Sequence, residues 1–111
     1  MAKIQRIYFI LLQSGPRYHR HGTAVEVLTM EAVEEYWKKI PSISPKGLPI
    51  HYVLGGRVIG KMLNASLLKR ENYVCIECDA VITDEILLTQ SPPLNLEQVA
   101  RASILRDPEI L

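Results

Sequence analysis

A chain of 111 residues is long enough for one domain that buries roughly two-thirds of the surface its unfolded state exposes. Hydrophobic residues make up 48% of the chain, so we expect a full core. Thirteen basic residues nearly balance twelve acidic ones, and the net charge of +1 argues against nucleic-acid or membrane binding that depends on bulk charge.

The first predicted element is the apolar run from Ile7 to Leu12, which follows Lys3 and Arg6. Six apolar residues are too few for a signal-peptide core or a membrane span, so we expect neither. An unbroken apolar run of this length is typical of a central strand that is buried on both faces. Ser14, Gly15 and Pro16 then end the pattern.

A basic loop comes next, and a short strand from Thr23 to Leu28 follows it. The loop is formed by Arg17, Tyr18, His19, Arg20 and His21. Its local positive charge predicts a surface that binds an acidic protein partner. The two histidines could hold two corners of a metal site, but no third ligand stands at a telling spacing, so we predict a solvated loop and no metal.

An amphipathic helix is predicted over residues 30–40. Thr29 is a suitable N-cap, and Pro41 ends the helix because it forces the preceding residue out of the helical conformation. One apolar stripe recurs at three- and four-residue spacing: Met30, Val33, Trp37 and Ile40. Glu34 with Lys38, and Glu35 with Lys39, are predicted to form ion pairs one turn apart.

A β-hairpin is the clearest feature of the second half of the chain. Its second strand, from Tyr73 to Thr83, alternates with period two, and the apolar face is Val74, Ile76, Cys78, Ala80 and Ile82. The polar residues 69–72 form its loop. Cys75 and Cys78 resemble a CxxC pair, but residues three apart on a strand point to opposite faces, so we interpret them as ordinary cysteines.

The remaining segments complete the predicted fold. Residues 84–89 are expected to extend a strand, and a break at Ser91-Pro92-Pro93 precedes a helix from Leu96 to about Leu105 that Asn95 caps. The result is an α+β fold: a mainly antiparallel sheet, arranged as a small barrel or sandwich, with the helix at 30–40 and a short C-terminal helix. We assign residues 1–90 to a single domain and 91–111 to a proline-led segment whose helix packs in cis or docks on a neighbouring subunit.

A glycine-rich stretch, Gly55 to Lys61, has the spacing of a phosphate-binding loop. That motif needs a serine or threonine after the lysine to bind magnesium, and Met62 has no hydroxyl. We therefore predict a glycine turn between strands, and no cofactor.

His51 is the most informative candidate residue, because it lies between apolar neighbours just before the glycine turn and histidine is the side chain that most often serves as a general base. An isolated histidine at such a place is most often structural. The order of elements around it, from Gly22 to Thr83, is a helix opened by Thr29, the step Leu48-Pro49-Ile50-His51, a glycine turn, Ile59-Gly60-Lys61 and the hairpin. This order resembles the head-maturation (prohead) proteases of tailed phages, which share a fold with the herpesvirus capsid-maturation proteases.

The resemblance implies that His51 is the base for a serine nucleophile that cuts scaffold and capsid proteins. Only Ser91 and Ser103 follow the hairpin; Ser91 precedes two prolines, and Ser103 lies in the predicted C-terminal helix. Neither position promises a nucleophile held within hydrogen-bond reach of its base.

Three hypotheses follow. The first is a capsid-associated structural protein on a protease-like fold without proteolysis, in the virion or the host cytoplasm, with capsid protein and copies of itself as partners. The second is an active serine protease that uses His51 and Ser103. The third is a small protein-binding module unrelated to phage heads.

Overall fold

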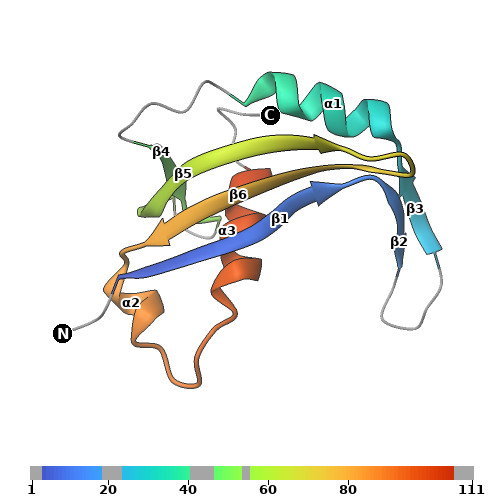
Figure 1. Ribbon diagram of the computed structural model, residues 1–111. Helices are drawn as coiled ribbons and strands as arrows, with labels where there is room; N and C mark the ends of the chain where they lie inside the picture. Colours follow the sequence, from blue (N-terminus) through green and yellow to red (C-terminus); the bar gives the residue numbers. More distant parts are fainter. Residues whose placement is uncertain (1–3, 19–23, 41–46, 54–55, 107–111) are drawn as a thin grey trace.

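The computed structural model describes residues 4–18, 24–40, 47–53 and 56–106, and the side chains of 17, 18 and 24–26 are not included in that description. The elements in chain order are β1 (Gln5–Gln13), β2 (Gly15–Tyr18), β3 (Ala24–Leu28), α1 (Met30–Lys39), β4 (Leu48–His51), β5 (Val58–Lys69), β6 (Val74–Ile82), α2 (Glu85–Leu88) and α3 (Leu96–Leu105). The main sheet has the order β1-β6-β5-β4 with every neighbouring pair antiparallel (Figure 1). The predicted α+β class is confirmed.

The prediction that the first strand is central and buried on both faces is wrong. β1 is an edge strand of the main sheet, and the side chains of Tyr8 and Ile10 are 64% and 39% exposed on its outer face. A bulge between Ile10 and Leu12 turns both Leu11 and Leu12 into the core. The apolar run therefore reflects a bulge and an exposed face, not burial on two sides.

The predicted hairpin is confirmed as β5 and β6. Arg70 N–H donates to the carbonyl of Tyr73 at 2.8 Å across its turn. All five residues of the predicted apolar face of β6 are buried, and so is Cys75 on the other face, where Leu68 and Gln13 flank it in the neighbouring strands. The predicted alternation of β6 is thus confirmed, and its outer face is less exposed than the sequence predicts.

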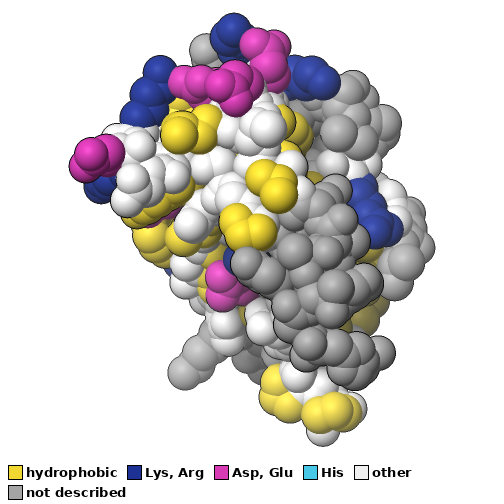
Figure 2. All heavy atoms as spheres, turned by 90° about the vertical axis from the view of Figure 1, so that its right-hand side faces the viewer, with side chains coloured by type: hydrophobic (Ala, Val, Ile, Leu, Met, Phe, Trp, Pro, Cys, Tyr) yellow, Lys and Arg dark blue, Asp and Glu magenta, His cyan; other side chains and the backbone are white. Residues whose placement is uncertain are grey.

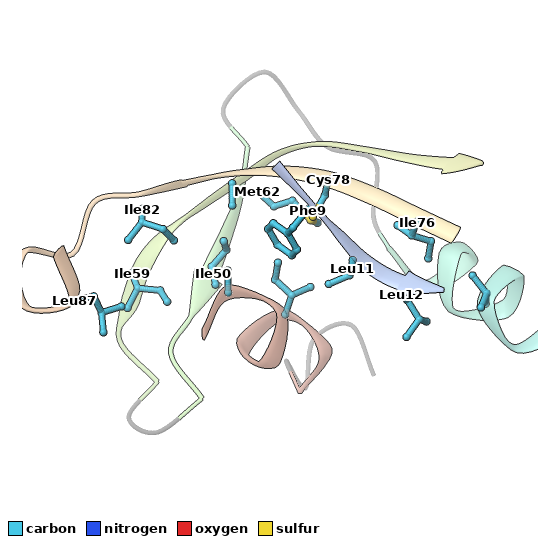
Figure 3. Close-up of a cluster of buried hydrophobic side chains, with 14 of the residues drawn as sticks. Phe9, Leu11, Leu12, Ile50, Ile59, Met62, Ile76, Cys78, Ile82 and Leu87 are labelled. Carbon is cyan, nitrogen blue, oxygen red and sulfur yellow. The ribbon is translucent and has the colours of Figure 1, made fainter. Parts of the chain in front are cut away.

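The core lies between the inner face of the sheet and α3. This helix contacts β1 and β4, the two edge strands, so it crosses the inner face from one side to the other. Figure 3 shows Phe9, Ile50 and Met62 pointing from the sheet toward it. Over the described residues the sheet stays open and is covered by helices, so neither the barrel nor the sandwich arrangement is formed. The predicted C-terminal helix is confirmed, with Asn95 as N-cap, and it packs in cis.

The amphipathic helix is also confirmed as α1, capped by the Thr29 side chain, which accepts from Ala32 N–H at 3.1 Å. Val33 is fully buried on the inner stripe. Figure 2 shows acidic and basic side chains gathered at the top of the molecule, at the height of α1 in Figure 1. Among the described residues of α1, neither predicted ion pair is formed: Glu34 Oε1 lies 2.6 Å from Nζ of Lys69 on β5, and Glu35 Oε1 lies 3.1 Å from Nζ of Lys38 instead of pairing with Lys39. A contact between elements has replaced one within the helix.

The expectation that residues 84–89 extend a strand is wrong. Asp84 is the N-cap of the short helix α2, and its side chain accepts from Ile86 N–H at 2.9 Å. Leu87 is buried in the core. An apolar run of this length is equally compatible with a strand or a buried helical turn, and the cap decides between them.

β2 and β3 form a separate two-stranded ribbon beyond the end of β1. Ser14 joins the ribbon to the main sheet: its N–H and Oγ both lie 2.9 Å from backbone partners on Val74. The short strand predicted up to Leu28 is confirmed as β3. The ribbon carries part of the predicted basic loop away from the core.

Candidate functional site

His51 is the last residue of β4, and it is half-buried. It pairs with Val58 of β5 across a bulge between Ile50 and His51. Directly after it the chain turns, with Tyr52 N–H donating to the Arg57 carbonyl at 2.7 Å and Gly56 N–H donating to the Tyr52 carbonyl at 2.8 Å. Gly56 has a φ of +73°, the left-handed region that glycine adopts without strain. The predicted glycine turn between strands is confirmed.

Ser103 lies on α3 and is 1% exposed. Its Oγ accepts a hydrogen bond from Val53 N–H at 3.2 Å. The fold therefore brings the predicted nucleophile to the segment that immediately follows His51. A nucleophile must also be reached by a substrate carbonyl, and this hydroxyl is enclosed between α3 and the end of β4. Ser91, the other candidate, is exposed between α2 and α3.

An arginine and an aspartate that the sequence did not single out close the same end of the sheet. Arg57 Nε donates to Asp84 Oδ2 at 2.6 Å, and its guanidinium lies 4.6 Å from the centre of the Tyr52 ring. Burial alone would raise the pKa of Asp84, but the Arg57 hydrogen bond, the Ile86 N–H and the charge of Arg57 outweigh it and lower the pKa. One sequence feature could have indicated the role of Asp84: it stands directly before an apolar run, where an aspartate can cap a helix.

A second cluster lies on the outer face of the sheet. Asp79 Oδ2 accepts from Arg6 at 2.7 Å and from Asn64 at 3.0 Å. These hydrogen bonds lower the pKa of Asp79. The cluster links β1, β6 and β5, so it stabilises the sheet from outside.

Arg101 makes a third set of contacts, on the open side of β1. Its Nε donates to the Ile10 carbonyl at 2.9 Å, and its NH2 group contacts Glu97 at 2.8 Å. The guanidinium also lies 5.6 Å from the centre of the Phe9 ring. Glu97, one turn earlier on α3, thus helps to hold the Arg101 side chain against the edge of the sheet.

The remaining candidates have structural explanations. Cys75 and Cys78 are free and buried, and burial, with a smaller contribution from Asp79, raises the pKa of Cys78 to about 12. Gly60 lies inside β5, where an added Cβ would stand 2.1 Å from the Val81 carbonyl oxygen. Its glycine therefore permits a close approach of two strands, and no helix follows it as a phosphate-binding loop requires.

The predicted binding loop lies only partly within the described residues. Arg17 and Tyr18 belong to β2, whereas His19, Arg20 and His21 lie outside the described ranges. Among the described residues no group of three histidine, cysteine or acidic side chains is placed to hold a metal ion. In the same part of the chain, no helix has the length and apolar character needed to cross a bilayer.

No protein-family model, curated protein or solved structure matches this chain. The resemblance to prohead proteases therefore stays a prediction, supported by the order of the elements around His51.

Proposed function

We propose that this chain is a structural, protein-binding subunit of a phage head, on a framework of the prohead-protease kind, and that it does not hydrolyse peptide bonds. The observation that carries the proposal is the role of Ser103, a serine that lies beside the His51 segment. Ser103 Oγ is enclosed and bonded to Val53 N–H, which gives it a structural task at the place where a protease needs a reactive hydroxyl.

The outer surface supports a binding role. Large apolar side chains are exposed on several elements, among them Ile4 at 68%, Val27 at 70% and Val58 at 54%. Exposed apolar surface is where proteins associate when it forms patches. The proposed partners are the capsid protein and further copies of the chain, and the proposed location is the virion or the host cytoplasm.

Quantitative mass spectrometry of purified mature particles, from a phage whose genome encodes the chain, tests the proposal. We expect the chain in a fixed ratio to the capsid protein. Particles that contain no copies would overturn the structural role.

The alternative, an active serine protease, is favoured by one observation: the Ser103 hydroxyl lies 3.2 Å from the backbone of Val53, two positions after His51. A fluorophosphonate probe distinguishes the two because it reacts with activated serines in folded enzymes. We expect no labelling of the native chain. Labelling at Ser103 that is lost in His51→Ala would establish the protease instead.

A further inference from the structure

The open side of β1 has the features of a strand that pairs with another chain. Figure 1 shows β1 along the border of the main sheet, opposite β4. An edge strand presents backbone N–H and C=O groups that can accept a further strand. Three exposed apolar side chains stand on the outer face of this border: Ile4 at 68%, Tyr8 at 64% and Ile10 at 39%.

The C-terminal half of β1 is protected against such pairing. The bulge between Ile10 and Leu12 interrupts its regular backbone, and Arg101 occupies the carbonyl of Ile10. Bulges and charged side chains are common devices that block sheet edges. The stretch from Ile4 to Phe9 has no bulge, and its one charged side chain, Arg6, is bonded to Asp79 of β6 on the outer face, so pairing is directed to this half.

The unprotected half also has room beneath it. A groove of about 340 Å³ opens beside Gln5 and Ile7, and its other walls come from α2 and from the start of α3. Alternate side chains of an added strand point to the inner face of the sheet. The inner-facing side chains of a second copy of β1 pack against its own core, so the groove only leaves the approach beside Gln5 and Ile7 unobstructed.

We propose that a second copy of this chain pairs antiparallel along β1, with Ile7 opposite Ile7 on the twofold axis. The Ile10 carbonyl points to Arg101 on the open side of β1, away from β6. Backbone groups of alternate residues point to opposite edges of a strand, so in the regular part of β1 the N–H and C=O groups of the even-numbered residues point to this open side. In an antiparallel ladder such residues stand opposite one another. Arg6 then faces Tyr8 of the second copy, and the ladder ends before Ile10, whose carbonyl Arg101 occupies.

Charge selects this register over its neighbours. A twofold axis one step toward the N-terminus places Arg6 opposite Arg6, and like charges directly opposite destabilise a strand pair. A shift one step the other way places Arg6 opposite Ile10. The Ile7-centred register instead sets Arg6, which keeps its bond to Asp79 of its own chain, beside the Tyr8 ring of the second copy, a favourable cation–π arrangement, and sets Ile7 against Ile7. This inference does not rest on the proposed capsid role.

Sedimentation equilibrium of the full chain tests the pairing. We expect wild type to approach twice the chain mass of 12.6 kDa at micromolar concentration. Tyr8→Pro removes the backbone N–H that faces the open side and should raise the dissociation constant about tenfold or more, whereas Tyr8→Phe, the matched control, keeps the N–H and the ring and should change it less than about threefold.

Cross-linking tests the register directly. Ile7 faces its own copy at a non-hydrogen-bonded position, where Cα atoms approach to about 4.5 Å. Ile7→Cys should therefore form a disulfide-linked dimer under mild oxidation, while Gln5→Cys, which faces Phe9, should not. A wild-type chain that is monomeric at every concentration overturns the proposal. So does a Tyr8→Pro chain that remains a dimer, or equal cross-linking of the two cysteine variants.

Discussion

The amide N–H of Val53 donates to the Oγ of Ser103 at 3.2 Å, across a separation of 50 residues. The bond joins the end of β4 to the buried face of α3. It is the contact that links the two halves of the site predicted from the sequence. Its chemistry is that of a hydrogen bond within the core, and it satisfies an amide that no longer belongs to the sheet.

We predict that Ser103→Ala lowers the free energy of unfolding by about 1–3 kcal/mol, because the Val53 N–H is left without its acceptor in a partly buried place. Ser66→Ala, at an exposed position of β5, is the control and should change it by less than about 0.5 kcal/mol. Urea denaturation followed by circular dichroism measures both. Equal stability of the two variants would contradict the structural role of Ser103.

Gly60→Ala should be among the most damaging single changes, with a loss of about 3 kcal/mol or more. The added Cβ would lie 2.1 Å from the Val81 carbonyl oxygen, and a backbone atom inside a sheet cannot move aside as a flexible side chain can. Thermal unfolding of the variant checks this. A variant as stable as wild type would show that β5 and β6 do not approach so closely at this point.

Acid should weaken the fold through Asp79 and Asp84. Their pKa values are lowered in the folded state, so the stability that they contribute is present above the usual pKa of 3.8 and is lost as the pH falls through the lower folded values. The free energy of unfolding of wild type should therefore fall below about pH 4. The double variant Asp79→Asn, Asp84→Asn should be less stable at neutral pH and should show a shallower pH dependence over that range. An unchanged slope would exclude these two carboxylates as its source.

The thiols of Cys75 and Cys78 should not react with a disulfide reagent such as DTNB in the native chain. Both are buried, and a pKa of about 12 at Cys78 leaves almost no thiolate near neutral pH. After unfolding in guanidinium both should react, so the titration should rise to two thiols per chain. Rapid reaction of the folded chain, or a disulfide between the two, would contradict the arrangement of β6.

The sequence patterns predicted correctly the elements that depend on interactions between residues close together in the chain. The alternation in β6 and the stripe of α1 follow from the periods of strand and helix, and the caps Thr29 and Asn95 act within one turn of their own position. Where distant segments compete, the predictions were wrong. Residues 84–89 have strand-like composition, but the Asp84 cap and the burial of Leu87 against the sheet make them helical.

By itself the sequence determined an α+β chain with one strong hairpin, one amphipathic helix and a capped C-terminal helix, because periodicity and capping depend on near neighbours. Only the tertiary structure decided that β1 lies at the edge of the sheet and that Ser103 is enclosed against Val53. A hydrophobic run has the same composition in the middle of a sheet as at its border, and a serine reads the same whether it faces solvent or the core. Which neighbour each residue meets is settled when the whole chain packs.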